Sequence, residues 1–387
     1  MFPLQGLRVL DFSAGVAGPH AGMLCAQYGA EVIKVEPPDG DWSRQLGRRH
    51  GDTTAYSHVY NQGKRSLAID LKHPQAAQAV RDMARHADVV IESYRPGVMR
   101  KFGLDYEAVH ATNPGVVYLS VTGFGSEGPL ANAPATDAVL QGFSGFMHAN
   151  RDMHGRPQRL DYFIIDVITG LYAFQAISAR LMARFRSMDV GGPIDCSLMR
   201  AAAALQAGKI AEVHFEGGES ATYVPLGVFQ TADGDTSLSV RRDDHFAALC
   251  NALGRDDLVA CGRYTTGADR IARAGELLPI LRSELRARST DEALALLAQA
   301  GVLHAQVNTY AQMLESEQVR LMGNFAWVPA SGDMPAFPVA KVPGVADAMS
   351  AGPSPAVGEH SVDVLRTWHV DAATIDLLLA EGAIRHR

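Results

Sequence analysis

Asp166 is the residue of this sequence whose surroundings best suit covalent chemistry. It lies within residues 161–170, between Ile165 and Val167. Apolar residues then recur at steps of three and four, as on one face of an amphipathic helix: Leu171, Phe174, Ile177, Leu181 and Phe185. Basic residues gather towards the far end of this stretch, where the helix dipole favours them: Arg180, Arg184 and Arg186. The helix is therefore expected to begin near Asp166. A carboxylate there can be a nucleophile that stays ionised while poorly hydrated, or it can simply cap the helix.

Other side chains that could do acid–base or metal chemistry lack the neighbours that such chemistry needs. Three histidines stand among helical or loop residues without a partner motif, and we interpret them as core or surface residues: His20, His245 and His304. Four cysteines are scattered without metal-ligand spacing, which is typical of buried or incidental thiols in a reducing cytoplasm: Cys25, Cys196, Cys250 and Cys261. No metal site is predicted.

The elements that must position Asp166 are predicted by an alternation of apolar strands and amphipathic helices. Strands are expected at residues 7–12, 31–35, 66–71, 88–92 and 116–122, and helices at 20–28, 74–87 and near 106–111. This alternation is typical of an α/β fold with a doubly wound parallel sheet. The turn at residues 13–19 is rich in small residues and follows the first strand. In an open α/β sheet, such a turn is the usual place for a phosphate-bearing ligand.

Residues 123–128 match the pattern G-x-G-x-x-G after a predicted strand. A dinucleotide site would require a helix at once, but Pro129 and Pro134 indicate a loop. No strand ending in an acidic residue follows about 20 residues later, as that site also requires. The segment is therefore predicted to be a mobile glycine-rich loop over a cleft, and not a nicotinamide site.

The sequence pattern changes in the second half of the chain. Helical patterns run from 166 to about 215, broken at 190–193 before a short strand at 194–197. A hairpin is predicted at 223–240 with Asp233-Gly234 as its turn, and helices follow to residue 301. The proline-rich tail is expected to cross back in extended form and to end in two short helices, near 362–365 and 372–379. The predicted limits are a large lobe at 1–221, a small lobe at 222–322 and a return segment at 323–387.

Bulk composition excludes several classes of protein. The chain has 387 residues, of which 47% are hydrophobic and 20% charged, and its net charge is -7. These values are ordinary for a globular enzyme of two lobes and disfavour a nucleic-acid partner. The start of the chain does not resemble a signal peptide, and no uncharged apolar run reaches the roughly 18 residues of a membrane span. We expect a cytoplasmic protein.

Several short motifs, taken in order, resemble the family III CoA-transferases, which include the α-methylacyl-CoA racemases. The motifs are Leu10-Asp11-Phe12 with Ala17-Gly18-Pro19, residues 29–36, Gly40-Asp41 with Arg44, Asn61 with residues 64–66, residues 95–97, residues 123–129, Asp166 with Thr169-Gly170, residues 232–234 and residues 358–360. Each motif is weak alone, but together they cover nearly the whole chain in the right order.

This resemblance implies a Rossmann-like large lobe built from both chain ends, a smaller α+β lobe and an interlocked homodimer. It implies acyl-CoA and a small carboxylic acid as substrates, with no permanently bound cofactor. It also assigns Asp166 as the nucleophile, which would attack the acyl-CoA thioester to form a mixed anhydride. The CoA thiolate would then convert that anhydride to an aspartyl-CoA thioester. The helix start is expected to help hold Asp166 ionised.

By position, the resemblance assigns CoA contacts to Val16, Ala17, Ile69, Lys72, Ser93, Tyr94, Arg95 and Lys101. The three basic residues of this set suit the pyrophosphate and the ribose 3′-phosphate of CoA. Asp137 is placed with the ligand site too, with the alternatives that it orients groups around Asp166 or caps a helix. Val16 stands where some family transferases carry a Gln that bonds the reacting acyl group, so the acceptor acid stays open.

Other functions remain as alternatives. A racemase of this family usually has a His directly before the Asp at position 137, but Thr136 stands here and is no base at neutral pH. A relative that binds CoA without activity, as an interaction protein, is the other alternative. Arg241 and Arg242 could bind the second carboxylate of a dicarboxylic acceptor, although pairing with the adjacent Asp243 and Asp244 is favoured.

Overall fold

The computed structural model describes residues 2–152, 154–188, 191–218, 221–331, 333–345 and 353–386. The chain divides into two compact units. Unit 1 combines Met1–Gly208 with Phe325–Arg387, so it contains both chain ends, and unit 2 is Lys209–Asn324. Unit 2 begins earlier than the small lobe that the sequence predicted at 222, because most of helix α10 (Ala207–Glu216) groups with it.

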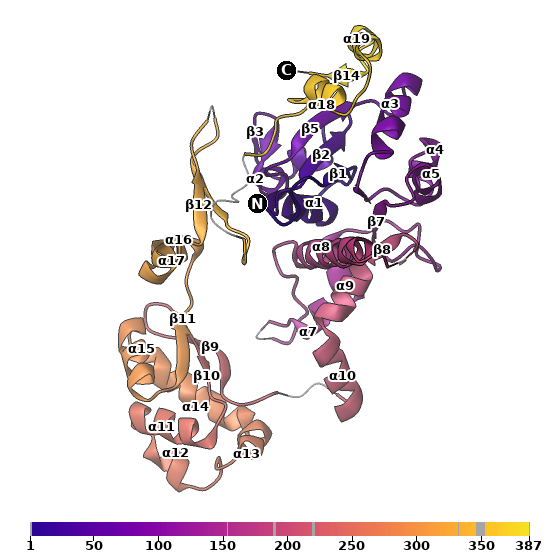
Figure 1. Ribbon diagram of the computed structural model, residues 1–387. Coiled ribbons are helices and arrows are strands. Elements are labelled where there is room, and N and C mark those ends of the chain that lie inside the picture. Colours follow the sequence, from indigo (N-terminus) through magenta and orange to yellow (C-terminus); the bar gives the residue numbers. More distant parts are fainter. Residues whose placement is uncertain are drawn as a thin grey trace. The chain divides into compact units, whose positions relative to one another are not determined.

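Unit 1 is built on a seven-stranded sheet (Figure 1) of order β14-β5-β2-β1-β6-β7-β8. The strands are β1 (Arg8–Asp11), β2 (Glu31–Glu36), β5 (Arg65–Ile69), β6 (Val89–Glu92), β7 (Val117–Thr122), β8 (Ile194–Ser197) and β14 (Ile384–Arg385). All neighbours pair in parallel except β14, which is antiparallel to β5. The α/β class and the parallel sheet predicted from the sequence are confirmed.

The six parallel strands have the order 3-2-1-4-5-6 when they are counted along the chain. This is the Rossmann order. The first strands are added on one side of β1, and the chain then crosses back and adds the later strands on the other side. The reversal lies between β1 and β6, which are adjacent. The carboxyl ends of these two strands therefore flank the crevice in which open α/β sheets bind ligands.

Helices cover both faces of the sheet, and the alternation of side chains along β1 shows why. Leu10 belongs to the core formed with α3 (Pro74–Ala84), α18 (Ser361–Thr367) and α19 (Ala372–Ala380). Its neighbour Val9 belongs to the opposite core, formed with α1 (Ala17–Gln27) and α8 (Ile164–Phe185). Burial on both faces explains why these strands read as continuous apolar runs.

Helix α8 begins two residues before Asp166, close to the predicted start. Its buried face runs mainly at steps of four: Ile165, Thr169, Gly170, Ala173, Ile177 and Leu181. The predicted stripe is therefore only partly correct, because Leu171 and Phe185 are exposed. The buried face includes the small residues Gly170 and Ala173. A face defined only by large apolar residues is therefore rotated away from it around the helix.

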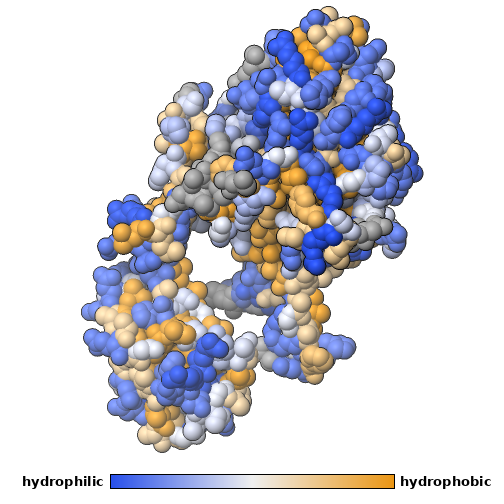
Figure 2. Space-filling view, viewed as in Figure 1, coloured by the Kyte–Doolittle hydropathy of each residue, from blue (hydrophilic) through white to orange (hydrophobic). Residues whose placement is uncertain are grey.

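By length and composition, α8 is the one helix in the described ranges that could cross a membrane, with 33% of its most apolar window buried. Several large apolar side chains of unit 1 are exposed on α8 and on neighbouring α6 (Asp137–Phe143) and α9 (Leu198–Leu205): Val139, Phe143, Leu171, Tyr172, Met182, Phe185 and Leu205. We call this set the apolar surface of α8. Figure 2 shows hydrophobic residues gathered on part of unit 1.

Further short elements complete unit 1. They are η1 (Trp42–Gln45), β3 (Arg49–His50), β4 (Thr53–Thr54), α2 (Ala55–Tyr60), α4 (Val98–Lys101), α5 (Tyr106–Thr112), α7 (Phe146–Ala149), β12 (Phe325–Val328) and β13 (Phe337–Ala340). Strands β12 and β13 of the return segment are extended, as predicted, and pair as an antiparallel hairpin that was not predicted. The predicted break at 190–193 lies partly outside the described residues, which resume at Gly191.

Unit 2 contains a three-stranded antiparallel sheet of order β11-β10-β9, covered by helices. Its elements are β9 (Leu226–Gln230), β10 (Asp235–Ser239), α11 (Asp243–Leu253), α12 (Asp256–Ala260), α13 (Gly267–Ala272), α14 (Ala274–Arg286), α15 (Thr290–Gln299), β11 (Leu303–Gln306), α16 (Tyr310–Glu315) and α17 (Glu317–Met322). The predicted hairpin is confirmed, with Thr231 N donating to Gly234 O across its turn at 2.9 Å. Strand β11 was not predicted, because it is short and largely exposed and so carries no apolar alternation.

Candidate active site

Asp166 lies in the first turn of α8 and is not its cap. The N-cap residue of α8 is Phe163, and its side chain makes no capping hydrogen bond. The carboxylate of Asp166 accepts no hydrogen bond from the described residues, and the side chain is partly exposed. The interpretation of Asp166 as a simple capping residue is therefore wrong.

The first N–H groups of α8 are instead bound by the carboxylate of Asp137, the first residue of α6. Its Oδ2 accepts from the backbone N of Ile165 at 2.7 Å and from that of Asp166 at 3.1 Å. Its Oδ1 accepts from Nε2 of buried Gln141 at 2.6 Å. A buried carboxylate with these contacts satisfies donors that every helix start leaves free. These contacts match the alternative that Asp137 orients groups around Asp166.

The electrostatics of Asp166 follow from this arrangement. Burial is the larger cause and the negative charge of Asp137 the smaller, and together they raise the pKa of Asp166 to about 7. The expectation that the helix start would hold Asp166 ionised is wrong, because Asp137 occupies the N–H groups that would have done so. The Asp166 anion is therefore poorly solvated and forms less readily than that of an ordinary aspartate.

The motif Thr169-Gly170 is explained by close packing of α8 on α1. A Cβ at Gly170 would lie 2.7 Å from the His20 ring and 2.8 Å from Ala17 O. His20 Nδ1 lies 3.1 Å from Val167 O. Burial lowers the pKa of His20 to about 4, so the ring is neutral and donates from Nδ1 to that carbonyl. His20, which the sequence indicated as a core or surface residue, is thus a buried residue of α1. It bonds to the carbonyl of Val167, the residue after Asp166.

Thr136, where a racemase would carry its His, serves as a cap. Its Oγ1 accepts from Val139 N at 3.4 Å at the start of α6. A hydroxyl engaged in this way is neither basic enough nor free to remove a proton from carbon.

The loops after β1 and β6 meet at the reversal of strand order. Ser93 Oγ accepts from Ala14 N at 2.9 Å, so these two loops are joined directly. Among the predicted CoA contacts, Val16, Ala17, Ser93, Tyr94 and Arg95 all belong to these loops or the helix start beside them. Their gathering at one edge of the sheet follows from the parallel register of β1 and β6.

The other predicted contacts follow neighbouring elements. Ile69 ends β5 and is buried, Lys72 follows it at the surface, and Lys101 ends α4. Lys72, Arg95 and Lys101 are exposed, and none of them forms an ion pair with a described residue. A cavity of about 310 Å³ is lined by Tyr94 and Arg95 together with Ser126 of the glycine-rich loop. These cations are thus available to phosphate groups.

Buried ion pairs fix the loop after β1. Three pairs form what we call the ion-pair network: Asp11–Lys64 at 2.7 Å, Lys34–Asp41 at 2.6 Å and Glu36–Arg44 at 2.7 Å. Lys34 Nζ also donates to Ser13 O at 2.5 Å, and Gly15 N donates to Asp41 Oδ1 at 3.2 Å. These residues are motif positions of the family resemblance, and only the structure shows that they hold residues 13–15.

The glycine-rich loop 123–128 is anchored by Asp195 of β8. Ser126 donates to Asp195 Oδ2 from its backbone N at 3.0 Å and from its hydroxyl at 2.8 Å. A Cβ at Gly123 would lie 2.2 Å from Ala135 Cβ, so this glycine permits close packing. The next helix is α6, which begins only at Asp137, and this agrees with the rejection of a dinucleotide site. Asp195 was not singled out from the sequence, since an Asp in a short strand carries no distinctive signal.

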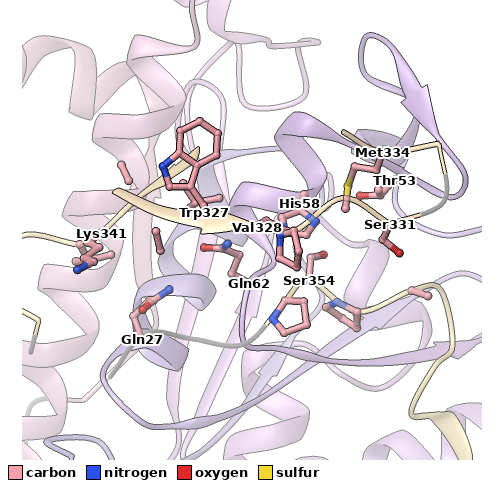
Figure 3. Close-up of a pocket in the computed structure, with 18 of the residues that line it drawn as sticks. Gln27, Thr53, His58, Gln62, Trp327, Val328, Ser331, Met334, Lys341 and Ser354 are labelled. Carbon is pink, nitrogen blue, oxygen red and sulfur yellow. The ribbon is translucent and has the colours of Figure 1, made fainter. Parts of the chain in front are cut away.

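A larger cavity of about 490 Å³ lies elsewhere in unit 1 (Figure 3), between α2, the β12–β13 hairpin and residues 353–359. Figure 3 shows His58 and Gln62 beside Trp327 and Val328 of β12. None of the predicted site residues lines it. We therefore place the candidate active site at the start of α8. A side chain with a shifted pKa is stronger evidence for an active site than the size of a cavity.

In unit 2, Arg242 forms a two-pronged ion pair with Asp244. Asp243 pairs with buried Arg270 at 2.8 Å, so the predicted pairing of the arginines with both aspartates is only half correct. Arg241 is exposed and has no partner among the described residues. No group of three or more His, Cys, Asp or Glu side chains that could hold a metal ion occurs in the described ranges.

Comparison with known proteins gives consistent results along the whole chain. The profile described as CoA-transferase family III matches residues 4–361. The succinate–glutarate CoA-transferase of Agrobacterium fabrum is 34% identical, over 94% of this chain and 95% of that protein. The succinyl-CoA:glutarate CoA-transferase of Mus musculus is 31% identical, over 99% of this chain and 91% of that protein.

Among solved structures, a CAIB/BAIF family protein from Brucella suis superimposes with a TM-score of 0.83 at 30% identity. The match covers 95% of this chain and 99% of that one. The similarity therefore extends over both units and not only over the Rossmann-like part.

Proposed function

The chain belongs to CoA-transferase family III and acts on acyl-CoA and carboxylic acid substrates, and we propose that Asp166 is the nucleophile of this transfer. The observation that carries the proposal is the state of its carboxylate. It lies in the first turn of α8, accepts no hydrogen bond from the described residues, and has its pKa raised to about 7. A poorly solvated anion without a cation is a stronger nucleophile than one in water.

The proposed reaction conserves the energy of the thioester in each step. The Asp166 carboxylate attacks the acyl carbonyl, the C–S bond breaks, and CoA thiolate leaves a mixed anhydride behind. The thiolate then attacks the aspartyl carbonyl and expels the donor acid, which leaves an aspartyl-CoA thioester. The acceptor carboxylate attacks this thioester to form a second anhydride and free thiolate. Attack of that thiolate on the acceptor carbonyl gives the new acyl-CoA and restores Asp166.

The proposed CoA site is the crevice between the loops after β1 and β6. Lys72, Arg95 and Lys101 would bind the phosphates, and Val16, Ala17, Ile69, Ser93 and Tyr94 would line the site. Their position at the reversal of strand order supports this assignment. Asp137 is proposed to position the start of α8 and to raise the pKa of Asp166, in place of the contact with CoA.

The proposed acceptor is a small dicarboxylic acid. Two relatives that align over more than 90% of this chain carry names for succinate and glutarate. Of the two arginines considered for the acceptor, Arg241 has no partner among the described residues, whereas Arg242 is paired with Asp244. The enzyme is proposed to act in the cytoplasm without a resident cofactor.

A homodimer is proposed because the apolar surface of α8 is large and exposed in the single chain. Exposed apolar side chains that gather on neighbouring helices are typical of interaction sites on proteins. Light scattering is expected to give twice the mass of the chain. A single-chain mass at micromolar concentration would contradict the dimer.

Trapping the covalent intermediate tests the nucleophile directly. Succinyl-CoA is mixed with the enzyme, borohydride or hydroxylamine is added, and the modified peptide is identified by mass spectrometry. Modification is expected at Asp166 and absent from an Asp166→Ala variant. Modification at Asp161 instead would move the nucleophile to that exposed residue. No modification of any carboxylate, with CoA still bound, would indicate a CoA-binding protein without transferase activity.

A further inference from the structure

One face of helix α2 lies against the start of α8. Tyr56 and Tyr60 are four residues apart on α2 and so share a face. The Tyr56 ring meets the ring of Phe163, the residue before α8, edge-on at 4.9 Å between centroids. Both tyrosines would be read from the sequence as ordinary residues of a short amphipathic helix.

The second tyrosine reaches α8 through His20. The ring centroids of Tyr60 and His20 lie 5.2 Å apart, and His20 donates to Val167 O on α8. Tyr56 thus contacts the residue before α8, while Tyr60 packs on the ring that bonds its first turn. The face of α2 that carries both tyrosines is therefore turned towards the turn that holds Asp166.

The hydroxyl of Tyr60 is a free donor. Tyr60 is half-buried, and its hydroxyl makes no hydrogen bond to a described residue. Burial raises its pKa to about 12, with smaller contributions from Tyr56 and from the charge of Asp166. The group therefore keeps its proton at every pH at which the enzyme works, and it can donate but not act as a base.

We propose that the Tyr60 hydroxyl donates a hydrogen bond to the carbonyl oxygen of the acyl group while Asp166 attacks it. The inference rests on the proposed role of Asp166. When the carboxylate oxygen bonds to the carbonyl carbon, the π electron pair moves onto the carbonyl oxygen. The Tyr60 O–H stabilises that negative charge without giving up its proton. Collapse of the intermediate then expels the CoA thiolate.

A donor from another element is useful here because the start of α8 supplies none. The first N–H groups of α8 are occupied by Asp137, and the side chain of Val16 has no polar group to offer the acyl oxygen. Oxyanion stabilisation requires a donor placed before the reaction begins. Packing of the Tyr60 ring on His20 restricts its motion and so provides this placement.

The test is Tyr60→Phe, which removes one oxygen and keeps the ring. The rate of thiolate release in a single turnover is expected to fall about 100-fold, the usual loss for one oxyanion donor. KM for acyl-CoA is expected to stay within about threefold, since the hydroxyl acts mainly in the transition state. The melting temperature is measured alongside to exclude misfolding.

Tyr28→Phe is the matched control. Its ring stacks on Phe174 of the same helix α8, at 5.1 Å between centroids, but two turns beyond Asp166. This variant loses the same atom and is expected to keep the wild-type rate. A Tyr60→Phe enzyme that releases thiolate as fast as wild type would overturn the inference.

The two proposals fail in different ways. If Tyr60→Phe is slow while the wild type is labelled at Asp166, both are supported. If the wild type is labelled at Asp166 and Tyr60→Phe is labelled at the same rate, only the role of Tyr60 fails. If the wild type binds CoA by calorimetry but Asp166 is not labelled, Asp166 is not the nucleophile. The role proposed for Tyr60 is then rejected as well, because it depends on attack by Asp166.

Discussion

Asp11 and Asp166 are two aspartates of unit 1, one fully and one largely removed from water, whose neighbours carry opposite charges. Asp11 is fully buried, with Lys64 Nζ 2.7 Å from its Oδ2. Burial alone would raise its pKa, but Lys64 and Lys34 outweigh burial and lower it. Asp166 has no such cation, and burial together with Asp137 raises its pKa to about 7.

The difference shows that burial raises the pKa of a carboxylate unless nearby cations outweigh it. The lowered pKa of Asp11 contributes stability that is present above its unfolded value near 3.8 and is lost as the pH falls through the folded value. The raised pKa of Asp166 acts in the opposite sense. Its contribution is full below pH 3.8 and is lost as the pH rises through about 7. One aspartate holds the fold, whereas the other destabilises it at working pH and gains reactivity.

The largest effect is expected from removing the reactive carboxylate. Asp166→Ala should lower CoA transfer by at least about a thousandfold, because a covalent step has no substitute within the turn. CoA binding should persist, as measured by calorimetry. At pH 8 the variant should also melt higher than wild type, and this gain should shrink towards pH 4. Substantial activity in the purified variant would remove Asp166 from the reaction.

The second largest effect is expected from removing the cation of the Asp11–Lys64 ion pair. Lys64→Met leaves Asp11 buried without its nearest cation and should cost about 3–5 kcal/mol in the free energy of unfolding. The double variant Asp11→Leu with Lys64→Met removes both charges and should be clearly more stable than Lys64→Met alone. Urea denaturation measures both. Equal stability of wild type and Lys64→Met would show that the Asp11–Lys64 pair contributes nothing.

The third effect tests whether Asp137 sets the acidity of Asp166. In the wild type, the rate of thiolate release should rise with pH through a midpoint of about 7, since the ionised form attacks. Asp137→Asn removes the like charge and keeps an oxygen for the N–H groups of α8. The midpoint should move down by about one pH unit. An unchanged midpoint would assign the shift to burial alone.

The smallest effect concerns the exposed cations. Lys72→Ala, Arg95→Ala and Lys101→Ala should each raise KM for acyl-CoA roughly two- to fivefold, because exposed charge contacts are weak. Turnover at saturation should barely change. Arg85→Ala is the control, since Arg85 is exposed but pairs with Asp82 on α3. A large loss of turnover at unchanged KM would instead place the cation in the chemistry.

Some of this comparison could be predicted from the sequence. The alternation of strands and helices predicted the parallel sheet, and the order of motifs pointed to Asp166 and to loops after β1 and β6. Very short elements were missed. Strand β14 has only two residues, and β11 is largely exposed and so shows no apolar alternation.

What the sequence determined by itself was the main elements of the parallel sheet and the position of the candidate nucleophile, because periodicity records which side of an element is apolar and the order of motifs points to Asp166. Only the tertiary structure decided the acidity of that nucleophile. Asp137 lies 29 residues before Asp166 and occupies its helix start, while Lys64 lies 53 residues after Asp11 and neutralises it. A pKa depends on the charges and donors within a few ångströms, and these come from other elements that no local pattern can bring together.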